Sequence, residues 1–311
     1  MSRDAFSYAP QNARDTTHSR SPRHRPAPLA DARDARGVAA GTSDRPLVSE
    51  ARTQHCRSAE RDDSPRAYSL RDRTYLLRDS EIHSLTEIGK FRVIAATDLT
   101  QYAYQGDRER IARDVRHLRS QGLLAENTIE ISQKKLLRVV TLTKAGHRLL
   151  SKTNQISDEQ AFYHGLREPR GAKHNADLYR IYQKEAARIE GAGGRRLRVI
   201  LDYELKRNMN RDLALHRPDQ ETEARRHEIA TRHGLKLVNG KILVPDLRIE
   251  YESAELEIRH IDLELATREY RPKALAAKAA AGFSLYSRPE DAPRLRRILD
   301  ERKLPAGILT L

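Results

Sequence analysis

The stretch Gly106–Leu124, GDRERIARDVRHLRSQGLL, has the pattern of one cationic helix with two different faces. Asp107 stands where an N-cap belongs, and Gly122 stands where the helix should end. Apolar residues recur at helical spacing along one side: Ile111, Val115, Leu118 and, past the end, Leu123. The other face is basic, and its candidate DNA contacts are Arg108, Arg110, Arg113, Arg116, His117 and Arg119. Such a helix suits the major groove of DNA, although a solvated surface helix carrying Glu109 and Asp114 has the same pattern.

Two helices are predicted upstream of this basic helix. Ser84 followed by Glu87 is a capping-box pattern ahead of a helix with apolar residues at Ile88, Phe91, Val93 and Ile94. A second, short helix fits residues 97–105, with Thr97 as its cap. The order helix, short helix, turn and longer basic helix is that of a helix-turn-helix.

A hairpin and a closing helix are predicted downstream. Two strand-like runs, Leu124–Ser132 and Leu136–Leu142, flank a polar, basic tip. Such a hairpin beside a recognition helix is typical of a wing, whose Lys134, Lys135 and Arg138 would contact phosphates. Thr143 then caps a helix within TLTKAGHRLL.

The segments DVRHLRSQGLL (residues 114–124) and LTKAGHRLL (residues 142–150) carry a family resemblance. They resemble the winged-helix regulators of the MarR type, in which a similar arginine helix, a wing and an LTxAGxxLL segment follow one another. The resemblance covers roughly residues 79–152. It implies a winged helix-turn-helix domain, placed here at residues 74–152, that binds double-stranded DNA.

Composition favours a polyanionic partner. The 311 residues carry a formal net charge of +14, and 33% of them are charged against 38% hydrophobic. Nucleic acid is favoured over a membrane because the sequence has no long apolar run. Cys56 is the only cysteine, which fits a cytoplasmic protein. Residues 1–73 lack lysine and any apolar period, so we expect a disordered basic arm or an overextended gene start.

The remaining sequence predicts a linker at residues 153–172 and a second domain at residues 173–311, an α/β core of about 130 residues. Helices are expected over His174–Glu190, over residues 219–232, from Pro272 through KALAAKAAAGFSLY, and over Asp291–Arg302. Strands are expected over Arg196–Leu205, Lys241–Tyr251, Leu256–Leu265 and Gly307–Leu311.

Two carboxylates interrupt these apolar strands, Asp246 after Val244-Pro245 and Glu264 between two leucines, with Asp262 two positions earlier on the same face as Glu264. A buried acid usually has a compensating partner, and a divalent metal is one. Asp246 and Glu264 on adjacent strands could hold Mg²⁺, with Glu204 or Glu185 as a third ligand. In the alternative, the acids form strand-end salt bridges with Arg248, Arg259 and Arg268.

The acidic strands resemble the PD-(D/E)xK nuclease fold, that is, the restriction-endonuclease-like fold. Pro245-Asp246 and Glu264-Leu265-Ala266 carry the resemblance. The family places a lysine where this chain has Ala266, so Lys278 on the next helix, or Lys273 or Lys206, would have to supply that charge. The resemblance implies Asp246, Glu264 and Lys278 as catalytic residues of a Mg²⁺-dependent DNA endonuclease or nickase, if the domain is active.

Together, VPDLRIEY, IDLELAT and the helix with Lys278 after a winged helix resemble the bacterial replication-relaxation family over residues 79–311. The resemblance implies a role in replication, DNA relaxation or mobilisation of a plasmid or other mobile element, with relaxase or replication proteins as partners. Winged-helix proteins often dimerise, which makes a homodimer a further expectation. Two alternatives remain open: a transcriptional regulator with an effector-binding or partner-binding domain, and an active metal-dependent nuclease.

Overall fold

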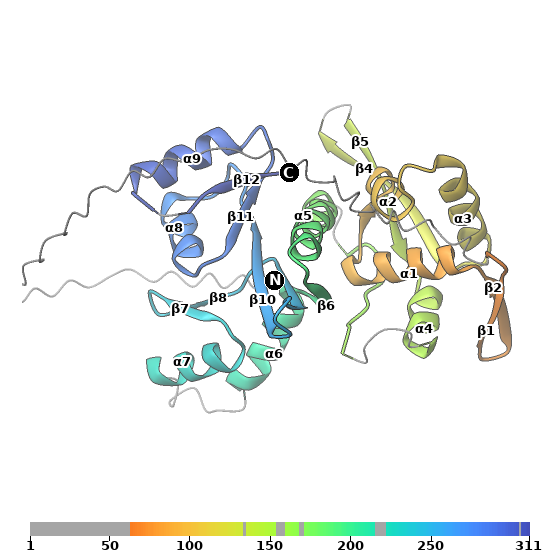
Figure 1. The fold of residues 1–311 in the computed structure, drawn as a ribbon, viewed down its shortest axis with the longest axis horizontal. Coiled ribbons are helices and arrows are strands. Elements are labelled where there is room, and N and C mark those ends of the chain that lie inside the picture. Colours follow the sequence, from red (N-terminus) through yellow and green to blue (C-terminus); the bar gives the residue numbers. More distant parts are fainter. Residues whose placement is uncertain (1–62, 133–134, 154–158, 168–170, 215–221, 305) are drawn as a thin grey trace, which may run out of the picture. The chain divides into compact units, whose positions relative to one another are not determined.

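The computed structural model describes residues 63–132, 135–153, 159–167, 171–214, 222–304 and 306–311, which belong to one compact unit of mixed α+β structure (Figure 1). Most of the expected basic arm lies outside these residues. Its end does not match the prediction, because an antiparallel hairpin, β1 (Arg66–Leu70) and β2 (Arg73–Leu77), forms within residues 1–73 and just beyond. Tyr75 and Leu77 point into the core, whereas the rest of the hairpin is mostly exposed.

The N-terminal elements follow the predicted order of helices and hairpin. They are α1 (Asp79–Phe91), β3 (Ile94–Ala95), α2 (Ala96–Ala103), α3 (Arg108–Ser120), β4 (Leu124–Ser132), β5 (Lys135–Leu142) and α4 (Lys144–Thr153). The three strands form a sheet in the order β3-β5-β4. The predicted start of the first helix was wrong. Glu81, which accepts a 2.8 Å hydrogen bond from the backbone of Arg78, closes the capping box, and Ser84 and Glu87 are buried inside α1.

The C-terminal elements build a five-stranded sheet in the order β12-β11-β10-β9-β6. Strands β6 (Arg195–Leu201), β9 (Leu247–Glu252) and β10 (Ile258–Leu265) pair antiparallel, and β11 (Ser284–Ser287) and β12 (Ile308–Thr310) add in parallel. Helix α8 (Pro272–Ala280) connects β10 to β11, and α9 (Ala292–Glu301) connects β11 to β12, as parallel pairing requires. The other elements are α5 (Ala172–Gly191), α6 (Asp202–Ala214), α7 (Glu223–Arg232), β7 (Lys236–Val238) and β8 (Lys241–Leu243).

Three predicted boundaries in this region were wrong. The first strand ends at Leu201, and Asp202–Ala214 is helical, with a 2.6 Å contact between Lys206 and Asp202 one turn apart. The strand expected over Lys241–Tyr251 is broken between β8 and β9, where Pro245 has no backbone N–H to donate. The alanine-rich helix ends before Gly282, whose φ of 83° reverses the chain into β11.

Helix α5 packs against both sets of elements. On one side Tyr179 and Tyr182 contact Phe91 of α1, with ring centroids 5.1 and 4.9 Å apart, and Arg180 pairs with Asp98 of α2 at 2.8 Å. On its other side α5 lies on β6, β9 and β10. One hydrophobic cluster therefore runs from α1 through α5 into the sheet.

Residues 159–167, which were expected to be part of a linker, are tied to both neighbours. Gln160 is buried, and its side-chain amide exchanges two 3.0 Å hydrogen bonds with the backbone of Val199 on the edge strand β6. The backbone N–H of Tyr163 donates to Gly89 of α1 at 2.8 Å. The amide of Gln160 thus replaces a neighbouring strand at this point of the sheet edge.

Gly146, within the LTKAGHRLL segment, gives α4 its close approach to the backbone at Leu123. A Cβ at this position would lie 2.2 Å from the carbonyl oxygen of Leu123. We expect Gly146→Ala to lower the free energy of unfolding by about 1–3 kcal/mol, measured by urea denaturation. Gly191→Ala is the matched control, because no atom lies near the Cβ position there. Equal stability of the two variants would contradict this packing.

Candidate functional site

Helix α3 docks through apolar side chains and one buried acid. Ile111 and Leu118 are buried, as predicted, but so is Asp114, which the surface-helix alternative placed in solvent. The Asp114 carboxylate accepts hydrogen bonds from the Ser80 hydroxyl at 2.6 Å and the Tyr104 hydroxyl at 3.1 Å. These bonds satisfy the buried charge and fix the rotation of α3 about its axis.

This rotation leaves the arginines of α3 facing solvent. Asp107 caps the helix by accepting the backbone N–H of Arg110 at 2.9 Å, as predicted. The exposed arginines are Arg108, Arg110, Arg113, Arg116 and Arg119. Arg110 and Arg113 contact Asp63 at 3.4 and 3.1 Å, and Arg119 contacts Glu126 at 2.8 Å. Within the described ranges, Arg108 and Arg116 form no ion pair.

His117 differs from its predicted place among the arginines. It is half-buried, and its Nδ1 lies 2.6 Å from the buried carboxylate of Glu81 on α1. The side chain therefore contributes to the packing of α3 on α1. The contact with Glu81 leaves it less available to DNA than the exposed arginines.

The predicted hairpin forms as β4 and β5, but only part of its basic tip is described. Lys134 lies outside the described residues, and Lys135 is exposed at the start of β5. Arg138 is exposed and lies 3.8 Å from Glu126, the acid that also pairs with Arg119. The hairpin and α3 thus carry cationic side chains around one shared carboxylate.

The second predicted site lies where β9 begins and β10 ends. These ends are adjacent because the strands are antiparallel, with Leu247 opposite Leu263. The carboxylate of Asp246 accepts the backbone N–H of Leu265 at 2.9 Å, and that of Glu264 accepts the N–H of Asp246 at 3.2 Å. Each acid is therefore held by the backbone of the opposite strand.

Lys278 of α8, one of the three lysines considered from the sequence, contacts Glu264. Its Nζ lies 2.8 Å from Glu264 Oε1 and donates to the carbonyl of Val244 at 2.8 Å. Tyr270 donates a further hydrogen bond to Glu264. Burial and the charge of Asp246 raise the pKa of Glu264 above its ordinary value, and Lys278 and Tyr270 oppose this shift.

His174 of α5 is a member of this site that the sequence did not reveal. Its Nε2 lies 3.5 Å from Asp246 Oδ1. Burial alone would raise the pKa of Asp246, but His174, the Leu265 amide and Lys278 lower it below its ordinary value. The chain has 12 histidines, and no pattern in the sequence distinguishes this one. Tyr270, six residues after Glu264, was missed for the same reason.

The remaining predicted ligands and partners lie elsewhere. Glu204 stands on α6, where it accepts the Tyr163 hydroxyl at 2.7 Å and pairs with Arg198, and Glu185 pairs with Arg188. One of the salt bridges expected as an alternative forms, between Arg248 and Asp262. The other two arginines pair elsewhere, Arg259 with Glu257 and Arg268 with Glu269. The cation at Glu264 is Lys278.

Other contacts already engage the oxygens that the expected Mg²⁺ site would use. No group of three or more His, Cys, Asp or Glu residues in the described part of the chain is placed to hold a metal ion. Both oxygens of Glu264 already accept hydrogen bonds, from Lys278 and Tyr270 on one side and from Asp246 N–H on the other. The proposed ligand set Asp246, Glu264 and Glu204 is not assembled, because Glu204 bonds to Arg198 and Tyr163.

Comparisons with other proteins add no further constraint. Among the described residues, no helix combines the length and apolar character needed to cross a membrane. A scan against models of known protein families and a search of curated protein sequences both found no match to this chain.

Proposed function

We propose that this protein binds double-stranded DNA, with α3 as the recognition helix of a winged helix-turn-helix and β4–β5 as its wing. The observation that carries the proposal is the row of five exposed arginines on α3, a helix whose opposite face is fixed by buried contacts. Rigid docking on one side and exposed guanidinium groups on the other are what entry into a major groove requires. The formal charge of +14 would favour association with DNA further.

We further propose that the five-stranded sheet with α5 and α8 is a PD-(D/E)xK-like domain that grips DNA or a partner without cutting. The order helix, three antiparallel strands, helix and parallel strand supports this relationship. The hydrogen bond from Tyr270 to Glu264 and the engagement of Glu204 with Tyr163 and Arg198 support binding without cleavage, because they use carboxylates that a metal site would need. The proposed setting is the bacterial cytoplasm, in the replication, relaxation or mobilisation of a plasmid or other mobile element, together with relaxase or replication proteins.

Fluorescence anisotropy with a labelled DNA duplex over a series of salt concentrations tests DNA binding. Each phosphate contact should contribute about −0.9 to the slope of log K against log salt, so three to five contacts predict a slope of roughly −3 to −4.5. Absence of binding at low salt would refute the proposal.

Incubation of supercoiled plasmid with Mg²⁺ or Mn²⁺ tests the proposal that the C-terminal domain does not cut DNA. Nicked or linear product that disappears in Asp246→Ala would identify an active nuclease instead.

Asp63 competes with DNA for the arginines of α3. Its carboxylate contacts Arg110 and Arg113, and exposed ion pairs of this kind contribute about 0–1 kcal/mol. We therefore expect Asp63→Ala to tighten duplex binding by about two- to fivefold, measured by anisotropy. Asp72→Ala is the control, because it removes the same charge from an exposed turn outside these ion pairs. Equal gains in the two variants would assign the effect to net charge alone.

A further inference from the structure

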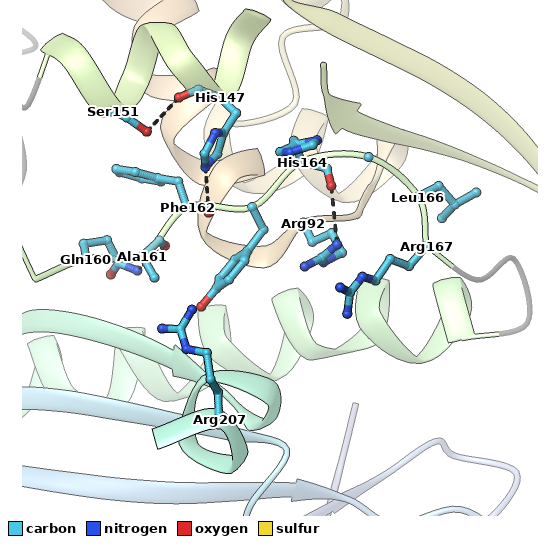
Figure 2. A pocket seen from close by; sticks show the side chains of 12 residues that line it. Arg92, His147, Ser151, Gln160, Ala161, Phe162, His164, Leu166, Arg167 and Arg207 are labelled. Carbon is cyan, nitrogen blue, oxygen red and sulfur yellow. Dashed lines mark hydrogen bonds between the residues drawn. The ribbon is translucent and has the colours of Figure 1, made fainter. Parts of the chain in front are cut away.

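A cavity of about 750 Å³ is lined by twelve described residues, of which five are basic and none is acidic (Figure 2). The basic residues come from separate elements: Arg92 after α1, His147 on α4, His164 and Arg167 on the segment that follows, and Arg207 on α6. The cavity has the size of an ordinary small-ligand site. Five basic side chains, with no acid among the described lining residues, favour an anionic occupant.

Arg92 is fixed at this cavity by an uncommon backbone conformation. Its φ of 66° places a non-glycine residue in left-handed space, a conformation that costs about 1 kcal/mol or more. Its guanidinium carbon lies 5.3 and 5.0 Å from the ring centroids of Tyr163 and Tyr203, and the group donates to the carbonyl of His164 at 3.4 Å. These contacts hold the cation in place before any ligand binds.

The other basic side chains of the cavity have fewer contacts with the rest of the protein than Arg92 has. Arg167 and Arg207 are exposed and form no ion pair within the described residues. His147 is engaged through Nε2 with the carbonyl of Phe162 at 3.0 Å. Burial and the nearby charges of His147 and Arg92 lower the pKa of His164, as expected where positive charge is concentrated. The guanidinium groups are therefore the available donors, and their planar geometry matches phosphate oxygens.

We propose that this cavity is a phosphate-binding site whose ligand is either a free nucleotide or a backbone phosphate of bound DNA. Figure 2 shows Arg92, Arg167 and Arg207 as the guanidinium groups that surround the space. The second source rests on the proposed DNA binding, whereas the first is independent of it.

Two probes and two double variants separate the sources. ATP without added metal is titrated by calorimetry, and a labelled duplex is titrated by anisotropy. The test variant is Arg167→Gln with Arg207→Gln. The control is Arg294→Gln with Arg297→Gln, which removes the same charge from exposed positions on α9. We expect at least one probe to bind the test variant about tenfold or more weakly than the control. Thermal unfolding confirms that both variants are folded.

Loss of ATP binding in the test variant would assign the site to a free phosphorylated ligand. Loss of duplex affinity alone would assign it to a DNA backbone phosphate. Restoration by Arg167→Lys with Arg207→Lys would support recognition through charge in either case. If neither probe distinguishes the test variant from the control, the phosphate site is refuted. Failure of DNA recognition by α3 is separate, because it would appear as insensitivity of duplex binding to substitutions on α3.

Discussion

Arg116→Ala should weaken the binding of a short labelled duplex by about tenfold, and Arg113→Ala combined with it by about a hundredfold. Arg116 is exposed and has no ion pair among the described residues, so its loss removes a proposed DNA contact without disturbing the fold. Arg113 also donates to the buried Asp114 at 3.0 Å, but Asp114 keeps its bonds from Ser80 and Tyr104 when this side chain is removed.

Anisotropy at several salt concentrations measures this effect. The slope of log K against log salt should become shallower by about one for each phosphate contact removed. Arg268→Ala is the control, because it removes one exposed arginine that pairs only with its neighbour Glu269 among the described residues. If Arg116→Ala and Arg268→Ala bind the duplex equally well, α3 is not the recognition helix.

Lys278→Met should lower the free energy of unfolding by about 3–5 kcal/mol. Glu264 is only 1% exposed, and the substitution removes the cation that neutralises it. Glu264→Gln combined with Lys278→Met should recover most of the loss, because a neutral amide needs no counter-charge and still accepts the N–H of Asp246. Urea denaturation of the two variants and the wild type measures the difference. Lys273→Met, at an exposed position on the same helix, should have little effect.

The pH dependence distinguishes a buried charge from lost packing. The pKa of Glu264 in the folded protein lies above its ordinary value. The charged form of Glu264 therefore destabilises the folded protein at pH values above the pKa that this residue has in the unfolded chain. This destabilisation disappears as the pH falls below the pKa of the unfolded chain. Removing Lys278 enlarges the destabilisation. The deficit of Lys278→Met relative to wild type should therefore shrink at acid pH. A deficit that does not change with pH would mean that packing of the lysine stem is what was lost.

The elements that the sequence predicted correctly are those with strong local signals. Asp107 caps α3, Gly122 ends it with a φ of 71°, and Thr143 caps α4 by accepting the N–H of Gly146 at 3.1 Å. The elements that were missed lack such signals. Strand β11 follows an alanine-rich helix with only Gly282 between them, and α6 begins directly after β6, so neither boundary is visible in hydrophobic period alone.

In the candidate sites, too, the features with a local sequence signal were predicted and those that depend on distant segments were not. The solvent exposure of the arginines of α3 followed from its apolar stripe, and the position of Lys278 near Glu264 was anticipated from the missing lysine at Ala266. The partners of Asp114, His117 and Asp246 come from distant segments, and only the folded chain brings Ser80, Glu81 and His174 to them. The roles of these residues in binding or catalysis stay predictions.

Helix α5 restricts the exchange of the N-terminal part of this protein for another domain. Modular proteins exchange DNA-binding parts freely when each part has a closed core of its own. Here Tyr179 and Tyr182 fill the core beside Phe91, while the same helix covers β6, β9 and β10. A different N-terminal part attached before residue 172 would have to present an apolar surface that packs against Tyr179 and Tyr182. Otherwise the apolar side of α5 would be exposed to water. Under the proposed function, changes in DNA specificity are therefore more accessible through substitutions on α3 than through replacement of the whole N-terminal part.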